Sequence, residues 1–346
     1  MKALVKVKPG KGFTLMDMPE PVIERPNEVI IKVKYASICG TDVHIYQWDE
    51  WSEKRIKPPR IIGHELCGEV VEAGKEVKSV KIGDIVSAET HIVCGDCYQC
   101  KIGNMHICDN VKILGVDIDG VFAEYVKIPA LNAWKVSSNI PIEVVSLFEP
   151  FGNAVHSTLI DEIVGKDVAV FGCGPIGLMS IGVAKVSGAK RVFAVEVSDY
   201  RLDFAKMMGA DFLINPLEED PVELILDKTD GHGVDVFLEM SGNPKAIIQG
   251  IKATKKGGRV SLLGIPKDKV VFEDFAEDIV FKYLKIYGIN GRLMFKTWYQ
   301  ANALLESGKV NLKPLITHKF KLEEYDKAMQ LLINKKAIKI LFEINP

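Results

Sequence analysis

The apolar positions of the chain follow two different patterns, one on each side of residue 160. Before this point, short apolar runs are separated by Gly and Pro, and they alternate with polar residues or are rich in β-branched side chains. Half-buried strands have this pattern, so we predict a compact, mostly β domain with long loops. Its clearest strands are predicted at residues 28–38, 68–74, 81–89 and 121–129.

After residue 160, apolar strands alternate with helices. The run at 166–172 predicts a buried strand, and the helical spacing at 175–188 ends in a glycine. The alternation continues with roughly six strands in all, which is typical of a doubly wound parallel sheet. The predicted fold class is therefore α/β, a mostly β domain followed by a doubly wound domain. The tail beyond residue 291 could complete either domain, and its helices and strands are predicted at 298–308, 315–320, 324–334 and 338–344.

Composition narrows the class of protein. A length of 346 residues suits two domains, and 47% hydrophobic residues provide enough apolar side chains for their cores. The formal net charge of −2 gives no electrostatic support for a nucleic-acid partner. The N-terminal stretch MKALVKVKPGKG lacks the apolar run of a secretory signal, and the longest apolar runs are too short or too broken to span a membrane. We therefore expect a cytoplasmic protein with no membrane partner.

Four of the seven cysteines lie within a single short stretch: Cys94, Cys97, Cys100 and Cys108. A disulfide framework is disfavoured, because the cysteine count is odd and the chain has no secretory context. A redox pair would need only two of the four. Four thiolates on one loop can instead complete the tetrahedral shell of a metal ion, so we predict a structural zinc ion here.

A glycine-rich turn follows the strand at 166–172. Gly172, Gly174 and Gly177 form a G-x-G-x-x-G between this strand and a helix, which is the context in which the motif binds the pyrophosphate of a dinucleotide. Glu196 ends the next strand, where its carboxylate can accept hydrogen bonds from ribose hydroxyls and repel a 2′-phosphate, which favours NAD over NADP. Arg201 nearby could instead accept that phosphate. The alternative is a glycine turn in a doubly wound domain that binds no nucleotide.

The other histidines and acidic residues suggest a second metal site. Cys39 and His64, together with one carboxylate, would supply the three protein ligands of a catalytic zinc. Glu65 is next to His64, and the stretch FEPFGNAVHS adds Glu149 and His156. Such an ion would act as a Lewis acid on a carbonyl or an alcohol.

A proton relay is a further possibility beside this site. Thr41 and His44 are close in sequence to Cys39, and a hydroxyl that passes a proton to an imidazole is a workable relay. Alternatively, Thr41 binds only backbone and His44 is an ordinary loop histidine.

Together, these motifs resemble those of the medium-chain zinc-dependent alcohol dehydrogenases. The run GHELCG (63–68), with five residues before Gly74, is similar to the zinc signature of that family, and the CGTD stretch, the cysteine lobe and the glycine turn occur in the family's order. The resemblance covers essentially the whole chain. It implies a GroES-like catalytic domain at 1–150, a Rossmann domain at 151–291, and a C-terminal segment, 292–346, that rejoins the catalytic domain.

The resemblance also implies roles for individual residues. It assigns a catalytic zinc to Cys39, His64 and Glu65, with Glu149 at or near the metal. It assigns the proton relay to Thr41 and His44, and an influence on substrate choice to His91. For NAD, the implied residues include Ile176, Glu196, Arg201, Leu263, Gly264, Ile265, Ile289 and Asn290. The resemblance further implies a homotetramer whose chains each hold a catalytic and a structural zinc.

Within this family, the stretches that begin at Ser37, Arg55, Glu89 and Ile113 are most similar to members that oxidise L-threonine. The implied reaction converts its 3-hydroxyl to a ketone, giving 2-amino-3-oxobutanoate, with NAD as the acceptor. A polyol or 2,3-butanediol dehydrogenase would use the same machinery. An NAD-binding protein without catalysis would lack a ligand or relay residue, and none is missing. Arg292 could meet a carboxylate or the cofactor, or form a surface ion pair.

Overall fold

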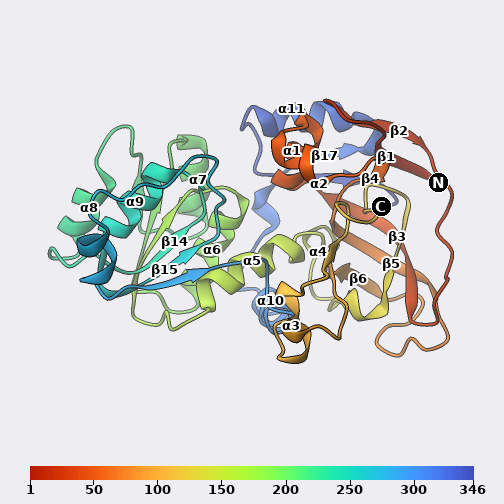
Figure 1. Cartoon of the computed structure of the whole chain (residues 1–346), viewed down its shortest axis with the longest axis horizontal. Helices are drawn as coiled ribbons and strands as arrows, with labels where there is room; N and C mark the ends of the chain where they lie inside the picture. Colours follow the sequence, from red (N-terminus) through yellow and green to blue (C-terminus); the bar gives the residue numbers. More distant parts are fainter. The chain divides into compact units, whose positions relative to one another are not determined.

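The chain divides into two compact units. The computed structural model describes all 346 residues (Figure 1), and it assigns residues 1–149, 293–302 and 312–346 to the first unit. The second unit comprises residues 150–292 and 303–311. None of the helices is both long and apolar enough to cross a bilayer.

Segment 303–311 departs from the predicted division, in which the whole tail rejoined the first domain. It belongs to the second unit because Val310, which is 4% exposed, packs against a helix of that unit. A Cβ placed on Gly182 would lie 3.6 Å from Val310 Cγ1. Helix α10 (Lys296–Glu306) therefore begins in the first unit and ends in the second, as does α5 (Phe148–Leu159).

The first unit is built mainly from antiparallel strands, as its alternating pattern predicts. Its strands are β1 (Lys2–Lys6), β2 (Thr14–Asp17), β3 (Glu28–Ser37), β4 (Arg60–Ile61), β5 (Glu65–Ala73), β6 (Ile85–Ala88), β7 (His91–Ile92), β8 (Lys112–Ile113), β9 (Tyr125–Pro129), β10 (Ala133–Lys135), β17 (Ile316–Lys321) and β18 (Lys339–Glu343). A seven-stranded sheet has the order β10-β6-β5-β3-β18-β17, with β9 also paired to β3. The smaller sheets are β2-β1-β4 and β7-β8.

The tail strands join this larger sheet. β18 is antiparallel to β3, with Leu341 opposite Ser37, and β17 is parallel to β18. The short helices of this unit are α1 (Gly40–Gln47), α2 (Glu50–Arg55), α3 (Tyr98–Lys101), α4 (Ile142–Val145), α11 (Tyr325–Ile333), η1 (Met105–Ile107), η2 (Ala130–Asn132), η4 (Lys313–Leu315) and η5 (Leu322–Glu324). The core combines side chains from β3, β5 and β18, among them Val33, Leu66 and Phe342, each 0% exposed. Burying an apolar side chain of this size contributes roughly 1.5–3 kcal/mol relative to exposure.

The second unit is a parallel sheet flanked by helices, which confirms the predicted α/β class. Its strands are β11 (Asp167–Phe171), β12 (Arg191–Val195), β13 (Phe212–Ile214), β14 (Val234–Glu239), β15 (Thr254–Leu262) and β16 (Lys285–Gly288). Its helices are α6 (Pro175–Val186), α7 (Asp199–Met207), α8 (Pro221–Lys228), α9 (Pro244–Lys252) and the π-helical turn η3 (Ala276–Val280). The strand order is β13-β12-β11-β14-β15-β16. The chain adds β12 and β13 on one side of β11 and then returns to add β14 on its other side, and doubly wound sheets bind ligands at the point between these two strands.

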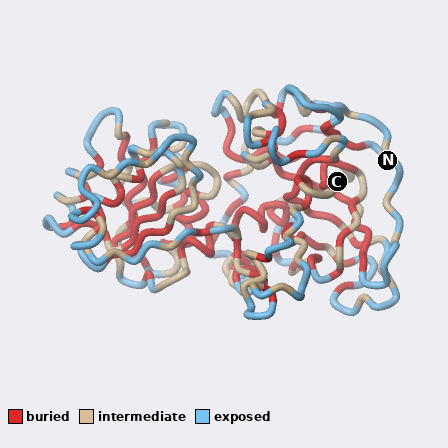
Figure 2. Tube along the Cα trace, viewed as in Figure 1, coloured by how far each residue is buried: buried red, intermediate tan, exposed pale blue.

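Burial explains why the two units have different sequence patterns. Every residue of β11 is buried, because helices cover both faces of a parallel sheet. Figure 2 shows the strands of the second unit mostly in red, the colour of buried residues. β3 instead alternates buried and half-buried positions over part of its length. The continuous apolar run of β11 therefore reflects a strand covered on both faces. The partial alternation of β3 reflects a strand with one face more fully covered than the other.

Candidate active site

The first cluster of metal-binding side chains lies where two paired strands end. β3 ends at Ser37 and β5 begins at Glu65, and these two residues are directly opposite each other. Cys39 follows β3 closely and His64 immediately precedes β5, so the pairing brings both beside Glu65. The ligand atoms of Cys39, His64 and Glu65, the three ligands that the family resemblance implies, all lie within 4.8 Å of one another.

Glu65 presents one free oxygen to this cluster. Its Oε2 accepts hydrogen bonds from the Ser37 hydroxyl and from the ammonium group of Lys339, and all three residues are at most 2% exposed. Its Oε1 is buried and has no hydrogen-bond partner. A buried oxygen without a partner is costly unless something binds it, and a cation beside Cys39 and His64 would do so.

Asp42 supports His64 from behind. Asp42 Oδ2 accepts the backbone N–H of Cys39 at 2.8 Å and so caps α1, while its Oδ1 lies 3.6 Å from His64 Nδ1. Burial raises the pKa of the Asp42 carboxyl to about 6, with His64 opposing the shift. Burial alone would lower the pKa of His64, but Asp42 and Cys39 raise it well above its usual value. A carboxylate behind an imidazole is the arrangement that orients metal-ligating histidines.

Glu149 and His156 lie on the same helix but differ in their surroundings. Glu149, in the first turn of α5, is 7% exposed and near enough to raise the pKa of His64. It is outside the cluster of three ligands, so its place at the metal stays a prediction. His156 contacts the carbonyl oxygen of Gly291 through Nδ1 at 2.9 Å, and it is not a member of the metal cluster.

The donor set of this cluster fits zinc. A thiolate, an imidazole and a carboxylate are the usual ligands of catalytic zinc, and three protein ligands leave one position for water or substrate. The partnerless oxygen of Glu65 is the structural observation in favour of an ion here. Cys39, His64 and Glu65 would therefore hold the metal, with Ser37, Lys339 and Asp42 as their supports.

The two predicted relay residues lie on α1. Thr41 Oγ1 is 3.8 Å from Cys39 Sγ, at the edge of the metal cluster. His44 is one helical turn further on, its side chain is 43% exposed, and its Nδ1 contacts Asp49 Oδ2 at 2.5 Å. Thr41 and His44 do not contact each other through a direct hydrogen bond, so a proton would cross between them through an intervening hydroxyl or water.

The four cysteines of the lobe converge as the sequence predicts. Their sulfur atoms lie within 4.8 Å of one another, with Cys108 Sγ 3.5 Å from Cys94 Sγ and 3.8 Å from Cys97 Sγ. Tetrahedral zinc with Zn–S bonds of about 2.3 Å separates its sulfurs by about 3.8 Å, whereas a disulfide needs about 2.05 Å. These spacings favour a metal over a disulfide.

Charge also favours an ion in the lobe. Backbone N–H groups of Cys100 and Asp109 lower the pKa of the Cys97 thiol to about 7, whereas burial raises the pKa of Cys100 to about 12. Four adjacent thiols cannot all ionise without a cation between them. Backbone N–H groups of Cys94 and Asn110 donate to Cys108 Sγ at 3.4 and 3.3 Å.

The glycine turn has the geometry that a pyrophosphate requires. Gly172 has a φ of +96°, and a Cβ on Gly177 would lie 1.9 Å from the Gly172 carbonyl oxygen, so helix and strand meet without room for a side chain. Gly174 is the N-cap of α6, and a Cβ there would meet nothing within 4 Å. The open space lies beside the free N–H groups at the start of α6, where an anion binds.

Glu196 immediately follows β12 and is held by several donors. Its Oε2 accepts the N–H of Cys173 at 2.9 Å and lies 3.6 Å from Arg201 Nη1, while its Oε1 accepts from the N–H groups of Val197 and Ser198. The carboxylate is thus fixed beside the glycine turn. Glu196 and Arg201, the two residues that the sequence suggests for the choice between NAD and NADP, therefore lie next to each other.

The remaining predicted cofactor residues share the carboxyl edge of the sheet, because they follow parallel strands. Ile176 lies in the first turn of α6, Leu263, Gly264 and Ile265 follow β15, and Ile289 and Asn290 follow β16. Sequence reasoning missed Glu239, the last residue of β14, whose backbone oxygen accepts from Leu263 and Gly264. A cavity of about 950 Å³, lined in part by Asp167, Arg191 and Lys255, lies at the opposite, amino-terminal ends of the strands.

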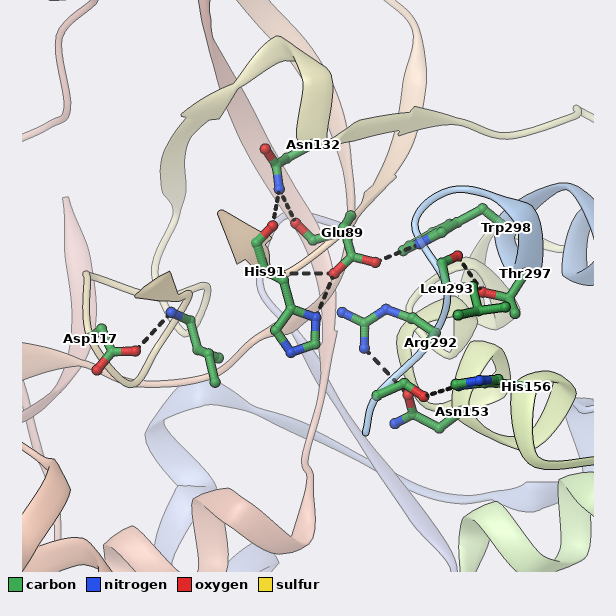
Figure 3. Close-up of polar contacts among 12 residues, drawn as sticks. Glu89, His91, Asp117, Asn132, Asn153, His156, Arg292, Leu293, Thr297 and Trp298 are labelled. Atoms are coloured by element: carbon green, nitrogen blue, oxygen red, sulfur yellow. Dashed lines mark hydrogen bonds and ion pairs between the residues drawn. The ribbon is translucent and has the colours of Figure 1, made fainter. Parts of the chain in front are cut away.

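Arg292 is buried, so the interpretation as a surface ion pair is wrong. It is 1% exposed, and its Nη1 lies 3.5 Å from Asn153 Oδ1 on α5 (Figure 3). A Cβ placed on Gly152 would lie 2.8 Å from Arg292 Cδ, so the lack of a side chain at residue 152 makes room for the guanidinium stem. Arg292 therefore helps to hold the turn after β16 against α5.

His91 is held by a buried carboxylate (Figure 3). Glu89 Oε1 accepts from the backbone N–H of His91 at 2.9 Å and contacts its ring Nδ1 at 3.0 Å. Glu89 Oε2 accepts from Trp298 Nε1 at 2.7 Å. Sequence reasoning proposed His91 but neither Glu89 nor Trp298, and the contact between the latter two spans 209 residues, which no local pattern reveals.

Comparisons with known proteins agree with this geometry. A family model described as alcohol dehydrogenase GroES-like domain matches residues 25–138, and one described as zinc-binding dehydrogenase matches residues 175–307. An L-threonine 3-dehydrogenase of Pyrococcus horikoshii is 54% identical over 345 residues, which is 99% of this chain and 98% of the relative.

Solved structures give the same picture. The alcohol dehydrogenase TADH from Thermus sp. ATN1 has a TM-score of 0.91 and 28% identity, with full coverage of both chains. An alcohol dehydrogenase from E. coli CFT073, solved in complex with NADH, has a TM-score of 0.90 and 30% identity, with 99% of each chain covered.

Proposed function

The chain belongs to the zinc-dependent medium-chain alcohol dehydrogenases, and from this premise we propose that it oxidises the 3-hydroxyl of L-threonine to 2-amino-3-oxobutanoate with NAD. It is an oxidoreductase of that family. The observation that carries the proposal is the convergence of Cys39, His64 and Glu65, with a buried oxygen left for an ion, in a chain 54% identical to a threonine dehydrogenase over nearly its full length.

The roles of the residues follow from their positions. When bound, zinc would lower the pKa of the substrate hydroxyl, and NAD would accept the hydride from the carbinol carbon. Cys39, His64 and Glu65 would hold the ion, and the four-cysteine lobe would hold a second, structural ion. The glycine turn and the start of α6 would bind the pyrophosphate.

A proton must leave the hydroxyl as the hydride leaves the carbon. We propose that Thr41, beside Cys39, passes it through one intervening hydroxyl or water to His44. Asp49 fixes His44 through Nδ1, and the exposed imidazole can release the proton to solvent. Burial would raise the pKa of Asp49, but hydrogen bonds from Ser52 and His44 outweigh burial and lower it, so Asp49 stays an acceptor for His44.

A substrate panel tests the proposed reaction. NADH formation is measured with L-threonine, sorbitol and (2R,3R)-butanediol, together with the zinc content of the chain. We expect the highest kcat/KM for L-threonine and two zinc ions per chain, one for each of the two ligand clusters in the structure. A preference for sorbitol or butanediol would move the chain to the polyol or diol dehydrogenases, and no turnover of any alcohol would indicate a non-catalytic NAD-binding protein.

Glu196→Gln tests the choice of NAD over NADP. The carboxylate repels a 2′-phosphate, and it pairs with Arg201, which the substitution would free to bind that phosphate. We expect the ratio of kcat/KM for NAD to that for NADP to fall by about tenfold. A like charge at close range costs about 1.4 kcal/mol or more, the energy that corresponds to a shift of one pKa unit, and its removal would favour NADP by this amount. Glu196→Gln with Arg201→Gln should recover part of the preference. An unchanged ratio in both variants would contradict the role of Glu196.

Location and assembly rest on the sequence and the resemblance. We propose a cytoplasmic homotetramer. Apolar side chains in the segment that precedes edge strand β16 are more than half exposed, and a partner chain would cover them; they include Phe275, Val280 and Phe281.

A further inference from the structure

The buried carboxylate of Glu89 contacts two side chains, those of His91 and Trp298. It is 1% exposed, and it is bonded to the backbone N–H and the ring Nδ1 of His91 and to the indole N–H of Trp298. Asn132 fixes the same segment, because its Nδ2 donates to the backbone oxygens of Glu89 and His91 at 2.7 and 2.9 Å. Glu89 thus holds the ring of His91, and Asn132 holds its backbone.

The strand register places this group at the end of the sheet that carries the metal ligands. β5 and β6 are antiparallel with Gly68 opposite Val86, and Ser87 Oγ donates to the Leu66 oxygen at 3.0 Å. The chain that leaves β6 toward His91 therefore runs beside the chain that enters β5 at Glu65.

A second contact agrees with this placement. The backbone oxygen of Thr90 accepts from the N–H of Leu114 at 3.1 Å. The next residue, Gly115, packs directly on Gly63, because a Cβ on Gly115 would lie 2.2 Å from the Gly63 oxygen. Gly63 immediately precedes the metal ligand His64, so the segment of His91 lies close to the metal cluster.

His91 is bonded on one ring nitrogen. Glu89 has no proton to give as a carboxylate, so the shared proton is on His91 Nδ1, and Nε2 of the neutral ring is an acceptor. Nε2 points away from Glu89 (Figure 3). In this tautomer the lone pair of the imidazole is on Nε2, on the side of the ring away from Glu89.

We propose that Glu89 is a positioning residue that holds His91 so that Nε2 accepts a hydrogen bond from the α-ammonium group of the substrate. The proposal rests on the proposed function and deepens it, because it assigns the residues that distinguish an amino alcohol from a diol. An ammonium group has only donors to offer, so it needs an acceptor.

The role of Trp298 follows from the same geometry. Its indole N–H can only donate, and it is 1% exposed, with its ring stacked on Phe148 at 5.9 Å between centroids. It therefore locks the second oxygen of Glu89 and prevents the carboxylate from turning away from His91. A glutamine in place of Glu89 has the same shape, but its amide NH2 would face either the indole N–H or the N–H groups of His91, donor against donor.

The test is Glu89→Gln, with kinetics on two substrates. We expect kcat/KM for L-threonine to fall by roughly 10- to 100-fold, which is the usual effect of losing an orienting carboxylate, and mainly through KM. Turnover of (2R,3R)-butanediol, which has no ammonium group, and the KM for NAD should change by less than about twofold, because neither depends on the acceptor at Nε2. Trp298→Phe keeps the stacked ring, removes the donor and should show the same split to a smaller degree.

Nitrogen NMR of the imidazole gives a second readout. In the unmodified chain, His91 is expected as the tautomer with the proton on Nδ1, and in Glu89→Gln this preference should be lost. Equal loss for threonine and butanediol, or an unchanged tautomer, would overturn the role of Glu89. If the unmodified chain oxidises butanediol and not threonine, the proposed function fails instead, and the tautomer alone then tests the pairing of Glu89 with His91.

Discussion

Cys39→Ser is expected to lower kcat for L-threonine by at least about a thousandfold and to remove one zinc ion per chain. A neutral hydroxyl binds zinc far more weakly than a thiolate, and His64 and Glu65 alone are two ligands. Loss of a Lewis acid worth several kcal/mol corresponds to this factor in rate. Cys39 is also the N-cap of α1, a position that serine suits well, so the fold should survive. Steady-state kinetics and zinc content per chain measure the effect.

Cys67→Ala is the matched control. Cys67 is fully buried and lies only two residues beyond Glu65 on β5, but it is not in the metal cluster, and burial raises the pKa of its thiol to about 12. The variant should keep both zinc ions and full activity, at a stability cost of about 1 kcal/mol. If Cys39→Ser kept its zinc, or lost it without losing activity, the assignment of this cluster as the catalytic centre would be wrong.

The second large effect is expected from two alanine substitutions in the glycine turn. Gly177→Ala would place a Cβ 1.9 Å from the Gly172 carbonyl oxygen, so the turn must move, which we expect to lower the free energy of unfolding by about 3 kcal/mol. Gly174→Ala meets nothing within 4 Å and has an ordinary negative φ of −67°, so its stability should stay within about 0.5 kcal/mol. Its methyl group would instead occupy space that the pyrophosphate needs.

The pair separates folding from cofactor binding. Urea denaturation should distinguish Gly177→Ala from the unmodified chain, and NAD titration should show a Kd raised by at least about tenfold, or 1.4 kcal/mol, for Gly174→Ala. Normal NAD affinity in a stable Gly174→Ala variant would show that the pyrophosphate does not approach this turn.

Local features of the sequence were enough for much of the fold. β11 and α6 were predicted to within a few residues, because a continuous apolar strand, a glycine turn and a proline at the first helical position are all local signals. The same holds for the cysteine lobe, whose ligands all come from one short stretch of the chain. The position of β18 in the first unit had no local signal, and only the family resemblance implied it.

The site was predictable only in part, for a related reason. Cys39 and His64 could be proposed from residue type, and the family resemblance implied Glu65. Lys339, which pairs with Glu65, is a single lysine in an apolar strand 274 residues away. Glu89 and Trp298 are similarly remote from each other. Contacts of this kind are set by which strands pair, and that is decided by the whole sheet.

Arg292 gave the opposite difficulty. An arginine that follows a turn suggests the surface, and this one is buried. The space for its side chain comes from the missing Cβ of Gly152, which lies on a helix 140 residues earlier in the chain. The residues near Arg292 in the sequence therefore give no sign that its side chain is buried.

The Lys339–Glu65 pair also bears on how the protein matures in the cell. The ribosome adds Lys339 274 residues after Glu65, long after the entire cysteine lobe has been synthesised. The four cysteines of the lobe come from one short stretch, so they can come together while translation continues. Glu65 gains this partner only when the strand that carries Lys339 has been made and has paired with β3, so its carboxylate stays without the lysine until the chain is nearly finished.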